Sequence, residues 1–455
     1  MNNYEQYFNW PVVHLEHFYI YFALAGLTAL YLVVKSDSKY KIELFFLSFF
    51  LLTGNLNDML TVKIPGFSFF ELQPIRLLYL LLLLFIIRTT FLSKDKQLLK
   101  LNKKTPWFVL LIYAYVILLI LSVVVNITHM GVPDGLKVIL DAAAFLILLT
   151  SLRLMADKPS YDLIGKTIII GAVVSSLVSL VQISIDPYFL RIGDARLAFG
   201  ELLRSNGIFS TEYFNSYYLI IAIAWTLVTI KKNWLKTSLL ILFSLGVIST
   251  FQRMSWVILV LIFITYLVFI QKAAIEKLLL IGLTSLALVL SLSIFYYQDI
   301  MNSTMVKERL SQTVEGREGY YTMVLDNIGK KPLFGFGDLK NEVYYVNLLR
   351  ITKDRDRATA TTGDLHSGYF SAMFLYGIPA FVCFTLFVLF GVFYYSKAFN
   401  DNLYFVIPFL VSILYMIGNL TNTFLFLKYV SVLYAIHIGI GMGINKIREQ
   451  AISKD

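Results

Sequence analysis

The sequence predicts an all-α polytopic membrane protein, and three observations lead to this fold class. Of the 455 residues, 58% are apolar and only 15% are charged, whereas about 25% are charged in a typical soluble domain. Apolar runs long enough to cross about 30 Å of hydrocarbon recur along the chain. Basic residues gather in alternate loops between these runs. The composition excludes an ordinary soluble enzyme, a disordered chain and a fibrous protein.

Hydropathy predicts about 13 membrane-spanning segments, with 12 as the alternative because the second segment is short enough to be re-entrant. The first run lacks a basic flank and a small-residue cleavage site, so we do not interpret it as a cleaved signal peptide. The expected spans are 17–34, 42–56, 69–88, 107–126, 136–152, 163–184, 214–230, 235–250, 254–271, 278–297, 367–395, 403–420 and 424–445.

The distribution of lysine and arginine predicts the orientation in the membrane. One set of loops holds 21 basic residues, whereas the opposite short loops hold six. Because cytoplasmic loops carry the excess of basic residues, we expect the first set and the C-terminus in the cytoplasm. The formal charge of +10 is then mostly a topology signal, and no nucleic-acid partner is expected.

The chain divides into three parts. Residues 1–297 are expected to form transmembrane helices 1–10 with short loops, 298–366 a large extracytoplasmic loop, and 367–455 the C-terminal transmembrane helices and a cytoplasmic tail. The large loop holds ten basic and ten acidic residues, so we expect it to be folded. Residues 305–328 have helical composition, and Pro332 ends that helix. Long ordered loops usually carry function.

Five histidines are present, and one of them stands where chemistry is expected. His14 and His17 lie three residues apart near the N-terminus, where interfacial anchoring is the better interpretation because further metal ligands are missing nearby. We therefore expect no metal site. His366 lies where the large loop re-enters the membrane, within 363–368. The alternative for His366 is a residue at a helix start that is satisfied by backbone groups.

Three arginines are expected on the same face of the membrane as His366. Arg253 lies at the outer start of a span, where arginine is costly unless it is paired or faces a polar cavity. Arg317 lies in the large loop, with a salt bridge to a nearby acid as the alternative, and Arg204 precedes another span. Guanidinium groups suit phosphate because their fork donates two hydrogen bonds and stays charged. The combination favours a site for an anionic lipid-linked substrate, in which the imidazole acts as a base.

At four stretches the sequence resembles the superfamily of O-antigen ligases and of O-antigen and capsular polysaccharide polymerases. These stretches are 204–218, 249–256, 316–337 and 365–380. The family pattern is a Gly-Arg, about fifteen residues before a Pro-Leu-Phe-Gly-type turn, and then a histidine at a helix start. The distances also fit, with 64 positions from Arg253 to Arg317 and 49 from Arg317 to His366. The resemblance covers the second half of the chain well and the first half only by hydropathy.

Two positions depart from the family pattern. Ser367 follows the histidine where the family commonly has asparagine, and Gln252 precedes Arg253 where serine is usual. Both departures leave the imidazole and the guanidinium in place.

The resemblance implies a metal-independent membrane glycosyltransferase of the GT-C type that needs no cofactor. Its donor would be a glycan on undecaprenyl pyrophosphate. Arg253 and Arg317 would bind the pyrophosphate leaving group, and His366 would orient or deprotonate the acceptor hydroxyl, with inversion at the anomeric carbon. Arg204 is a further candidate for lipid-phosphate or glycan contact. Tyrosines that could stack on sugars, with loop packing as the alternative, are Tyr320, Tyr321, Tyr344, Tyr345 and Tyr369.

The resemblance also implies the setting. The protein would be a multi-pass component of the bacterial cytoplasmic (inner) membrane, with its active site on the extracytoplasmic face. Its partners would be the undecaprenyl-pyrophosphate-linked oligosaccharide and membrane lipid. A chain-length regulator and a flippase are further candidate partners.

Three functions stay open at this point. The leading hypothesis is a polysaccharide polymerase that joins lipid-linked repeat units, because this branch is more divergent and the chain departs from the ligase-like motif twice. The nearest alternative is an O-antigen ligase that transfers the glycan to the lipid A core. The third is a polytopic transporter, for which ionisable residues near the midplane of spans are expected. The spans here have few of them, since Asp141 and Lys428 lie nearer to span ends.

Overall fold

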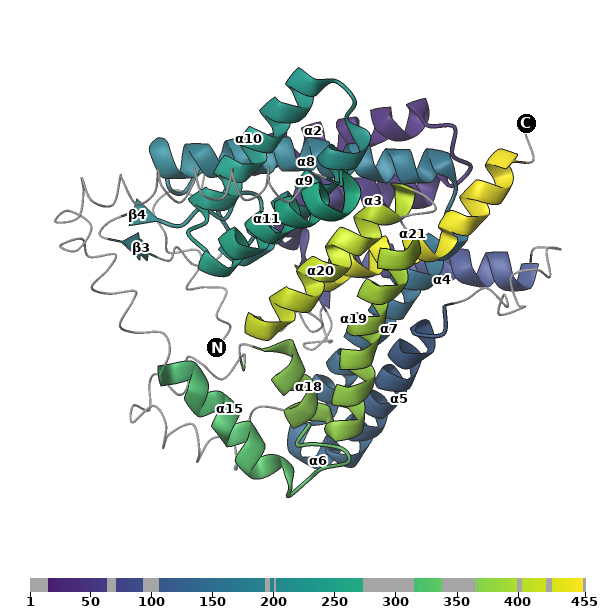
Figure 1. The fold of residues 1–455 in the computed structure, drawn as a ribbon, viewed down its shortest axis with the longest axis vertical. Coiled ribbons are helices and arrows are strands. Elements are labelled where there is room, and N and C mark those ends of the chain that lie inside the picture. Colours follow the sequence, from purple (N-terminus) through teal and green to yellow (C-terminus); the bar gives the residue numbers. More distant parts are fainter. Residues whose placement is uncertain are drawn as a thin grey trace.

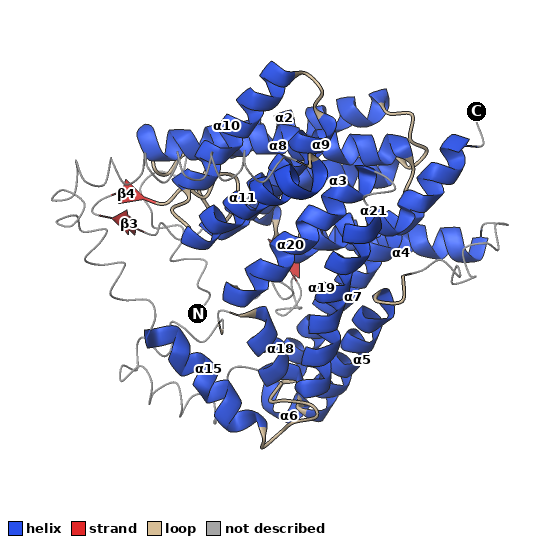
Figure 2. Ribbon diagram, in the orientation of Figure 1, coloured by secondary structure: helices blue, strands red, loops and turns tan. Residues whose placement is uncertain are grey.

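The computed structural model describes residues 15–63, 71–92, 106–192, 197–199, 202–272, 315–337, 365, 367–398, 403–422 and 428–452. Within these ranges the chain is helical apart from turns and four strands of two or three residues (Figure 2). The all-α fold class is therefore confirmed. The strands form two small antiparallel pairs, β1 (Val62–Lys63) with β2 (Glu71–Leu72) and β3 (Leu197–Phe199) with β4 (Leu202–Leu203).

Each expected span except 278–297, which lies outside the described residues, coincides with a helical segment. The first six are α2 (Leu15–Lys35), α3 (Lys41–Thr53), α4 (Pro74–Ile87), α5 (Val109–Val125), α7 (Val132–Leu154) and α8 (Lys158–Ser184). The next are α9 (Glu212–Thr229), α10 (Asn233–Ser249), α11 (Arg253–Thr265), α18 (Gly368–Tyr376), α19 (Ile378–Ala398), α20 (Val406–Thr421) and α21 (Lys428–Ile452). Shorter pieces are α6 (Ile127–Met130), the 3₁₀ segments Gly54–Leu60 and Leu403–Phe405, and the π-helical turns Arg88–Leu92 and Tyr266–Ile270.

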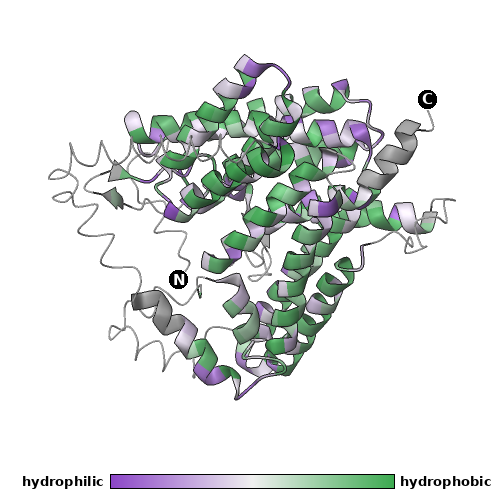
Figure 3. Cartoon of the chain, in the orientation of Figure 1, coloured by the Kyte–Doolittle hydropathy of each residue, from purple (hydrophilic) through white to green (hydrophobic). Residues whose placement is uncertain are grey.

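Six described helices are long and apolar enough to cross a membrane by length and composition, and four shorter helices are also apolar. Their outward faces carry large apolar side chains, such as Leu27, which is 64% exposed, and Ile117, which is 58% exposed. Figure 3 shows apolar residues along the helices and polar residues gathered towards helix ends. Apolar side chains that face outwards in this number need lipid around them, because water would make their exposure costly.

Helix α9 forms the centre of the bundle. Almost every residue from Phe214 to Leu227 is buried, including the largest side chain, Trp225. A helix that is apolar on all sides is stable only when other helices surround it. Helices α8, α10, α11, α20 and α21 all pack against α9.

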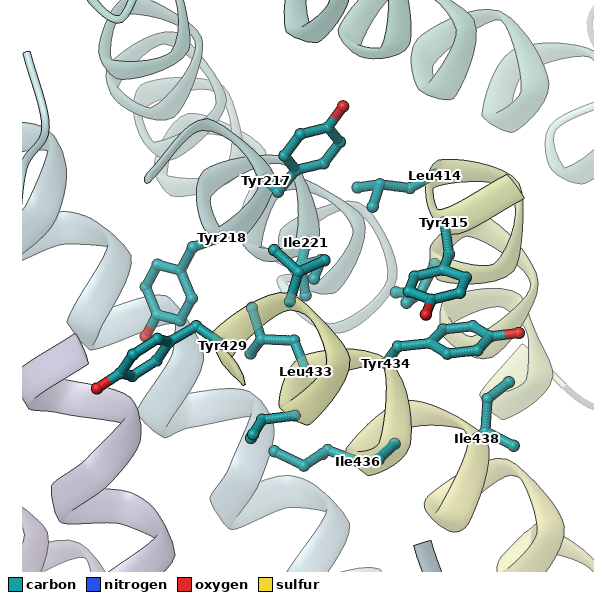
Figure 4. Packing of buried hydrophobic residues seen from close by; sticks show 14 of the residues in the cluster. Tyr217, Tyr218, Ile221, Leu414, Tyr415, Tyr429, Leu433, Tyr434, Ile436 and Ile438 are labelled. Atoms are coloured by element: carbon teal, nitrogen blue, oxygen red, sulfur yellow. The ribbon is translucent and has the colours of Figure 1, made fainter. Parts of the chain in front are cut away.

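Aromatic rings fill the contacts that α20 and α21 make with the rest of the bundle (Figure 4). Tyr415 of α20 and Tyr434 of α21 stack face to face with ring centroids 3.7 Å apart. At the start of α21, Tyr429 stacks on Phe50 of α3 at 5.1 Å. The first stack joins the last two helices to each other, and the second ties α21 to the first half of the chain.

The expected continuous span 367–395 is wrong, because the structure breaks it at Gly377 into α18 and α19. Gly377 has a φ of +90°, which side chains disfavour, and a Cβ at this position would overlap the carbonyl oxygen of Leu333. Pro379, which lacks an N–H, follows in the first turn of α19. The backbone N–H of Ile378 instead donates to the carbonyl of Pro332 at 2.8 Å. The large loop therefore returns to the membrane helices at this break.

We call the side of the bundle where α5, α8, α10 and α20 end, and where α9, α11 and α18 begin, the loop face. The β3–β4 pair, the start of α18 and α15 (Glu315–Ile328) all lie towards this side; in Figure 1 the strand pair is at the left and α15 is at the lower left. The elements that carry the expected site residues therefore share one face.

Candidate functional site

The first half of the site is a small cluster that joins α15, the 331–337 turn and α18, which we call the aromatic unit. Its core consists of Met323, Val324, Phe336, Leu365 and Phe374, all buried. Tyr321 stacks on Phe370 with centroids 4.5 Å apart, and Phe336 stacks on Phe374 at 4.6 Å. The aromatic unit thus holds the helix that contains position 317 against the helix that begins after position 366.

His366 itself lies outside the described residues, and the side chain of Arg317 lies outside the description as well. The structure describes the neighbours of His366 on both sides. Leu365 is fully buried in the aromatic unit, and Ser367 is the N-cap of α18, where its hydroxyl accepts from the N–H of Phe370 at 3.4 Å. Both described neighbours of position 366 are thus held in place, Leu365 by burial and Ser367 by its role as a helix cap.

The end of α20 fixes this helix start. The Ser367 hydroxyl donates to the carbonyl of Asn419 at 3.2 Å, and the N–H of Gly368 donates to the carbonyl of Asn422 at 3.0 Å. Gly368 packs so closely on Asn419 that a Cβ would overlap its side-chain oxygen. Ser367, which departs from the family pattern, thus caps α18 through its short hydroxyl.

The 331–337 turn is clamped between α5 and α18. Ser122 and Asn126, in the last turn and at the C-cap of α5, donate to backbone carbonyls of this turn, with Ser122 contacting Phe334 and Asn126 contacting Gly335 at 3.3 Å. The N–H groups of Phe336 and Gly337 donate to the carbonyls of Phe374 and Leu375, each at 2.9 Å. This accounts for the glycines, because Gly335 and Gly337 have φ values of +61° and +81°.

The second half of the site lies where α8, α9, α10 and α11 meet the loop face, together with the turns 186–191 and 203–208; we call it the polar platform. Arg204 belongs to it, and its Nη1 pairs with Glu212 Oε1 at 2.6 Å. Next to it, Ser205 binds Ser249 through both its hydroxyl, at 2.7 Å, and its backbone N–H, at 3.1 Å. The 203–208 turn is thereby fixed to the end of α10.

Arg253 is the first residue of α11 and is exposed. Gln252 before it accepts hydrogen bonds from Ser216 of α9 at 2.8 Å and from Ser255 at 2.7 Å. A positive charge at a helix N-terminus opposes the helix dipole by about 0.3–1 kcal/mol, whereas an anion there is stabilised. An anionic ligand beside Arg253 would therefore offset the positive charge at this helix end.

Helix α20 connects the two halves. It packs against α9 and α11 of the polar platform and against α18 of the aromatic unit. Figure 1 shows α20 between α11 and α18. The structure therefore brings the elements that carry positions 204, 253, 317 and 366 to one face and joins them through a single helix.

The tyrosines proposed for sugar contact have packing partners where they are described. Tyr321 stacks on Phe370, and its hydroxyl donates to the carbonyl of Leu420 at 3.4 Å. Tyr369 donates to the carbonyl of Met416 at 2.9 Å and packs on Phe384. The side chain of Tyr320, and Tyr344 and Tyr345 as a whole, lie outside the description.

The sequence analysis did not identify two charged residues of the polar platform as candidate site residues. Glu212, at the start of α9, is only 3% exposed and pairs with Arg204. Arg191 is buried beside them and donates to the carbonyl of Arg204 at 2.7 Å. One sequence feature could have indicated Arg191. It lies in a short apolar stretch of an expected outer loop, where anchoring at the cytoplasmic side does not explain a basic residue.

Among the described residues, no three His, Cys, Asp or Glu side chains gather in a way that could hold a metal ion. Apart from the Glu212 carboxylate, which pairs with Arg204, the polar side chains described in the site carry guanidinium, amide and hydroxyl groups, which donate hydrogen bonds to anions.

Residues 238–385 match the family described as O-antigen ligase, and a search among curated proteins finds no match. The matched range runs from α10 into α19 and contains Arg253, Arg317 and His366. Arg204 and Arg191 lie before it. Three of the four resembling stretches, 249–256, 316–337 and 365–380, lie within the matched range, and the match confirms the resemblance that they indicated.

Proposed function

We propose that this chain, whose residues 238–385 match the family described as O-antigen ligase, is a polysaccharide polymerase. It transfers a glycan from undecaprenyl pyrophosphate to a hydroxyl of another lipid-linked repeat unit. The observation that carries the proposal is the aromatic unit. Its stacked rings hold α15, with Arg317, against the start of α18, directly after His366.

In the proposed reaction, the acceptor hydroxyl oxygen attacks the anomeric carbon of the donor glycan. The new glycosidic bond forms as the bond to the pyrophosphate oxygen breaks, with inversion at that carbon. His366 takes the proton of the hydroxyl, and undecaprenyl pyrophosphate leaves. Arg253 and Arg317 neutralise the charge that develops on the leaving oxygen, an effect that is largest when the donors are held in advance. No metal or nucleotide takes part.

The preorganisation of Arg253 is supported by its neighbours. Gln252 is fixed by Ser216 and Ser255, so the first turn of α11 has a defined direction. On the other side, the N-cap hydroxyl of Ser367 and the carbonyl of Asn422 fix the start of α18. Fixed donors cost little reorganisation at the moment of reaction.

The second candidate is the ligase, which the description of the matched family favours. The donor chemistry is the same, and only the acceptor differs. Glycan analysis of a deletion strain separates the two functions. Loss of chain length with single repeats retained supports the polymerase, whereas free lipid-linked polymer with an uncapped lipid A core supports the ligase and contradicts the polymerase.

The proposed chemistry also requires the loop face to be extracytoplasmic. Cys383 is the single cysteine of the chain, so replacing it with serine gives a background for labelling. Cysteines introduced at 100 and 450 should then react only from the cytoplasmic side, and one at Lys330 only from the opposite side. Labelling of position 330 from the cytoplasmic side alone would overturn both the orientation and the proposed reaction.

A further inference from the structure

Arg191 is a buried guanidinium that the proposed chemistry does not use. It is only 7% exposed. Its Nε donates to the carbonyl of Pro187 at 2.6 Å, and its Nη2 donates to the carbonyl of Arg204 at 2.7 Å. Its third nitrogen, Nη1, is buried and has no hydrogen-bond partner in the described part of the chain. A buried donor without an acceptor costs about 1–3 kcal/mol, and more when it is charged, so its presence needs an explanation.

Arg204 adds a second donor of the same kind. Its Nη1 is used by Glu212, but its Nε is buried and also lacks a partner among the described residues. The Arg204 side chain as a whole is 22% exposed. Arg204 is therefore the member of the pair that a ligand can reach, and Arg191 lies behind it.

Arg191 stays charged in this corner of the polar platform. Burial lowers the pKa of Arg191 to about 10, while Tyr188, Glu212 and Asp186 act in the opposite direction. Arg191 thus stays cationic near neutral pH. Glu212 pairs with Arg204 Nη1, and Asp186 accepts from the N–H of Tyr188 at 2.9 Å, so neither carboxylate satisfies Arg191 Nη1 or Arg204 Nε in the described part of the chain.

Gln182 of α8 holds both arginine-bearing turns in place. It is 1% exposed, and its amide nitrogen donates to the carbonyls of Phe189 at 2.9 Å and Gly207 at 3.1 Å. Its amide oxygen accepts from the backbone N–H groups of Asn206 at 2.8 Å and Gly207 at 3.0 Å. One buried side chain therefore fixes the turn before Arg191 and the turn after Arg204, which preorganises the pair.

The pair lies beside Arg253 but is separate from it. Glu212, which holds Arg204, and Ser216, which binds Gln252 before Arg253, are four residues apart on α9. Side chains at this spacing lie on one helix face with Cβ atoms about 5–6 Å apart. The platform therefore presents two neighbouring cationic positions, each on its own anchor.

We propose that Arg191 and Arg204 form a second lipid-phosphate site, which takes the pyrophosphate of the acceptor while Arg253 and Arg317 hold that of the donor. Arg204 contacts the phosphate, and Arg191 is the positioning residue that holds the backbone of Arg204 and adds charge behind it. The inference rests on the proposed polymerase function, because that reaction brings two lipid-linked pyrophosphates to one chain.

Binding stoichiometry tests the second site. The full chain in nanodiscs of phosphatidylcholine is titrated with undecaprenyl pyrophosphate, and bound lipid is counted by native mass spectrometry. We expect two molecules per chain for the wild type and one for Arg204→Gln. The exposed Arg88, which is expected at the cytoplasmic side, supplies the control, since Arg88→Gln should keep two.

Kinetics test which substrate the site takes. An acceptor whose anomeric oxygen is replaced by methylene can accept a glycan but cannot donate one. We expect Arg204→Gln to raise the KM for this acceptor by about tenfold, the size of one charge-assisted hydrogen bond, with the donor KM and kcat nearly unchanged. Arg191→Lys should raise the acceptor KM less than Arg191→Met, because it restores the charge but not the fork.

Three outcomes would overturn the inference. The first is one bound lipid in the wild type, and the second is an unchanged acceptor KM in Arg204→Gln. The third is loss of one bound molecule when phosphatidylglycerol replaces phosphatidylcholine, which would make the site one for membrane phospholipid. The proposed function fails in a different way, through a wild-type protein that binds lipid pyrophosphate but makes no polymer.

Discussion

The polar platform and the aromatic unit hold the two halves of the same candidate site by different forces. In the polar platform, side-chain hydrogen bonds such as Ser205 to Ser249 and Ser216 to Gln252 fix the turns. In the aromatic unit, stacked rings such as Tyr321 on Phe370 join α15 to α18. Hydrogen bonds fix direction as well as distance, whereas apolar packing is not directional.

This difference fits the proposed roles of the two regions. The polar platform would hold charged phosphates, for which donor direction decides the strength of binding. The aromatic unit would bring the base to acceptor hydroxyls on glycans that grow in length, and packing alone suffices to keep two helices together. The comparison predicts that the two regions respond differently to substitution.

The largest effect is expected at His366, which directly precedes Ser367, the N-cap of α18. A general base typically contributes about 10²–10⁴ in rate, so His366→Ala should cut transfer by about that factor and leave donor binding largely intact. The assay is purified protein in nanodiscs with undecaprenyl-pyrophosphate-linked repeats, scored for ladder formation without added metal or nucleotide. A wild-type rate in His366→Ala would contradict the role of His366 as general base, and the proposed site would then consist of the arginines alone.

His129→Ala is the matched control for this experiment and should stay near the wild-type rate. Hydropathy alone does not separate His129 from His437 as controls, but the structure does. His437 is 1% exposed, its Nε2 accepts from Trp225 Nε1 at 2.9 Å, and its Nδ1 lies 2.5 Å from the carbonyl of Leu433. His437→Ala should therefore lower the stability of the fold by about 1–3 kcal/mol.

The next effect concerns one arginine from each region. If Arg253 and Arg317 hold the same pyrophosphate, Arg→Lys at either position should reduce ladder formation by about 10²-fold, because lysine keeps the charge but loses the bidentate fork. The double variant should lose less than the product of the two single losses. Arg355 lies in the run Asp354-Arg-Asp-Arg357, whose alternating charges predict a solvated salt-bridge patch, so Arg355→Lys should change little.

Full activity of Arg317→Ala at normal expression would show that Arg317, and with it the aromatic unit, does not bind the pyrophosphate. Strictly multiplicative losses in the double variant would indicate instead that the two arginines act on different groups.

A smaller effect is expected from the stack in the aromatic unit. Tyr321→Ala removes a ring pair worth about 0.5–1.5 kcal/mol beyond its buried area, so transfer should fall by up to about tenfold through misplacement of α15. Tyr321→Phe keeps the ring and loses only the long hydrogen bond to Leu420, so it should retain activity. Equal losses in both variants would show that the hydroxyl acts on the sugar rather than the ring on Phe370.

The smallest effect is expected from Gln252 in the polar platform. Gln252→Ser introduces the residue that the family usually has here and removes the acceptor of Ser216 and Ser255. These two hydroxyls already lie 2.6 Å apart and can bind each other, so we expect a loss of only about two- to fivefold, on the order of 0.5–1 kcal/mol. A loss as large as that of Arg253→Lys would assign Gln252 to the substrate itself.

Hydropathy and charge along the chain determined the helical class and the positions of the described spans, except for the break at Gly377 that divides the span 367–395. This was possible because the length of an apolar run must match the hydrocarbon thickness and basic residues favour cytoplasmic loops. Both are local properties of the chain. The same reasoning placed Arg253 at the start of a helix, where the structure has it. It also indicated a helix that contains Arg317 and a turn at 333–337, because glycine and proline act on the backbone near them.

Contacts between distant residues were decided by the tertiary structure alone. The break at Gly377 follows from the close approach of Leu333, and Trp225 meets His437 across 212 positions of the chain. Arg191, Arg204 and Glu212 come together only because Gln182 holds two turns that hydropathy leaves undefined. Apolar periodicity specifies which face of a helix is buried, but the partner on that face depends on shape and on hydrogen bonds formed only when the helices pack.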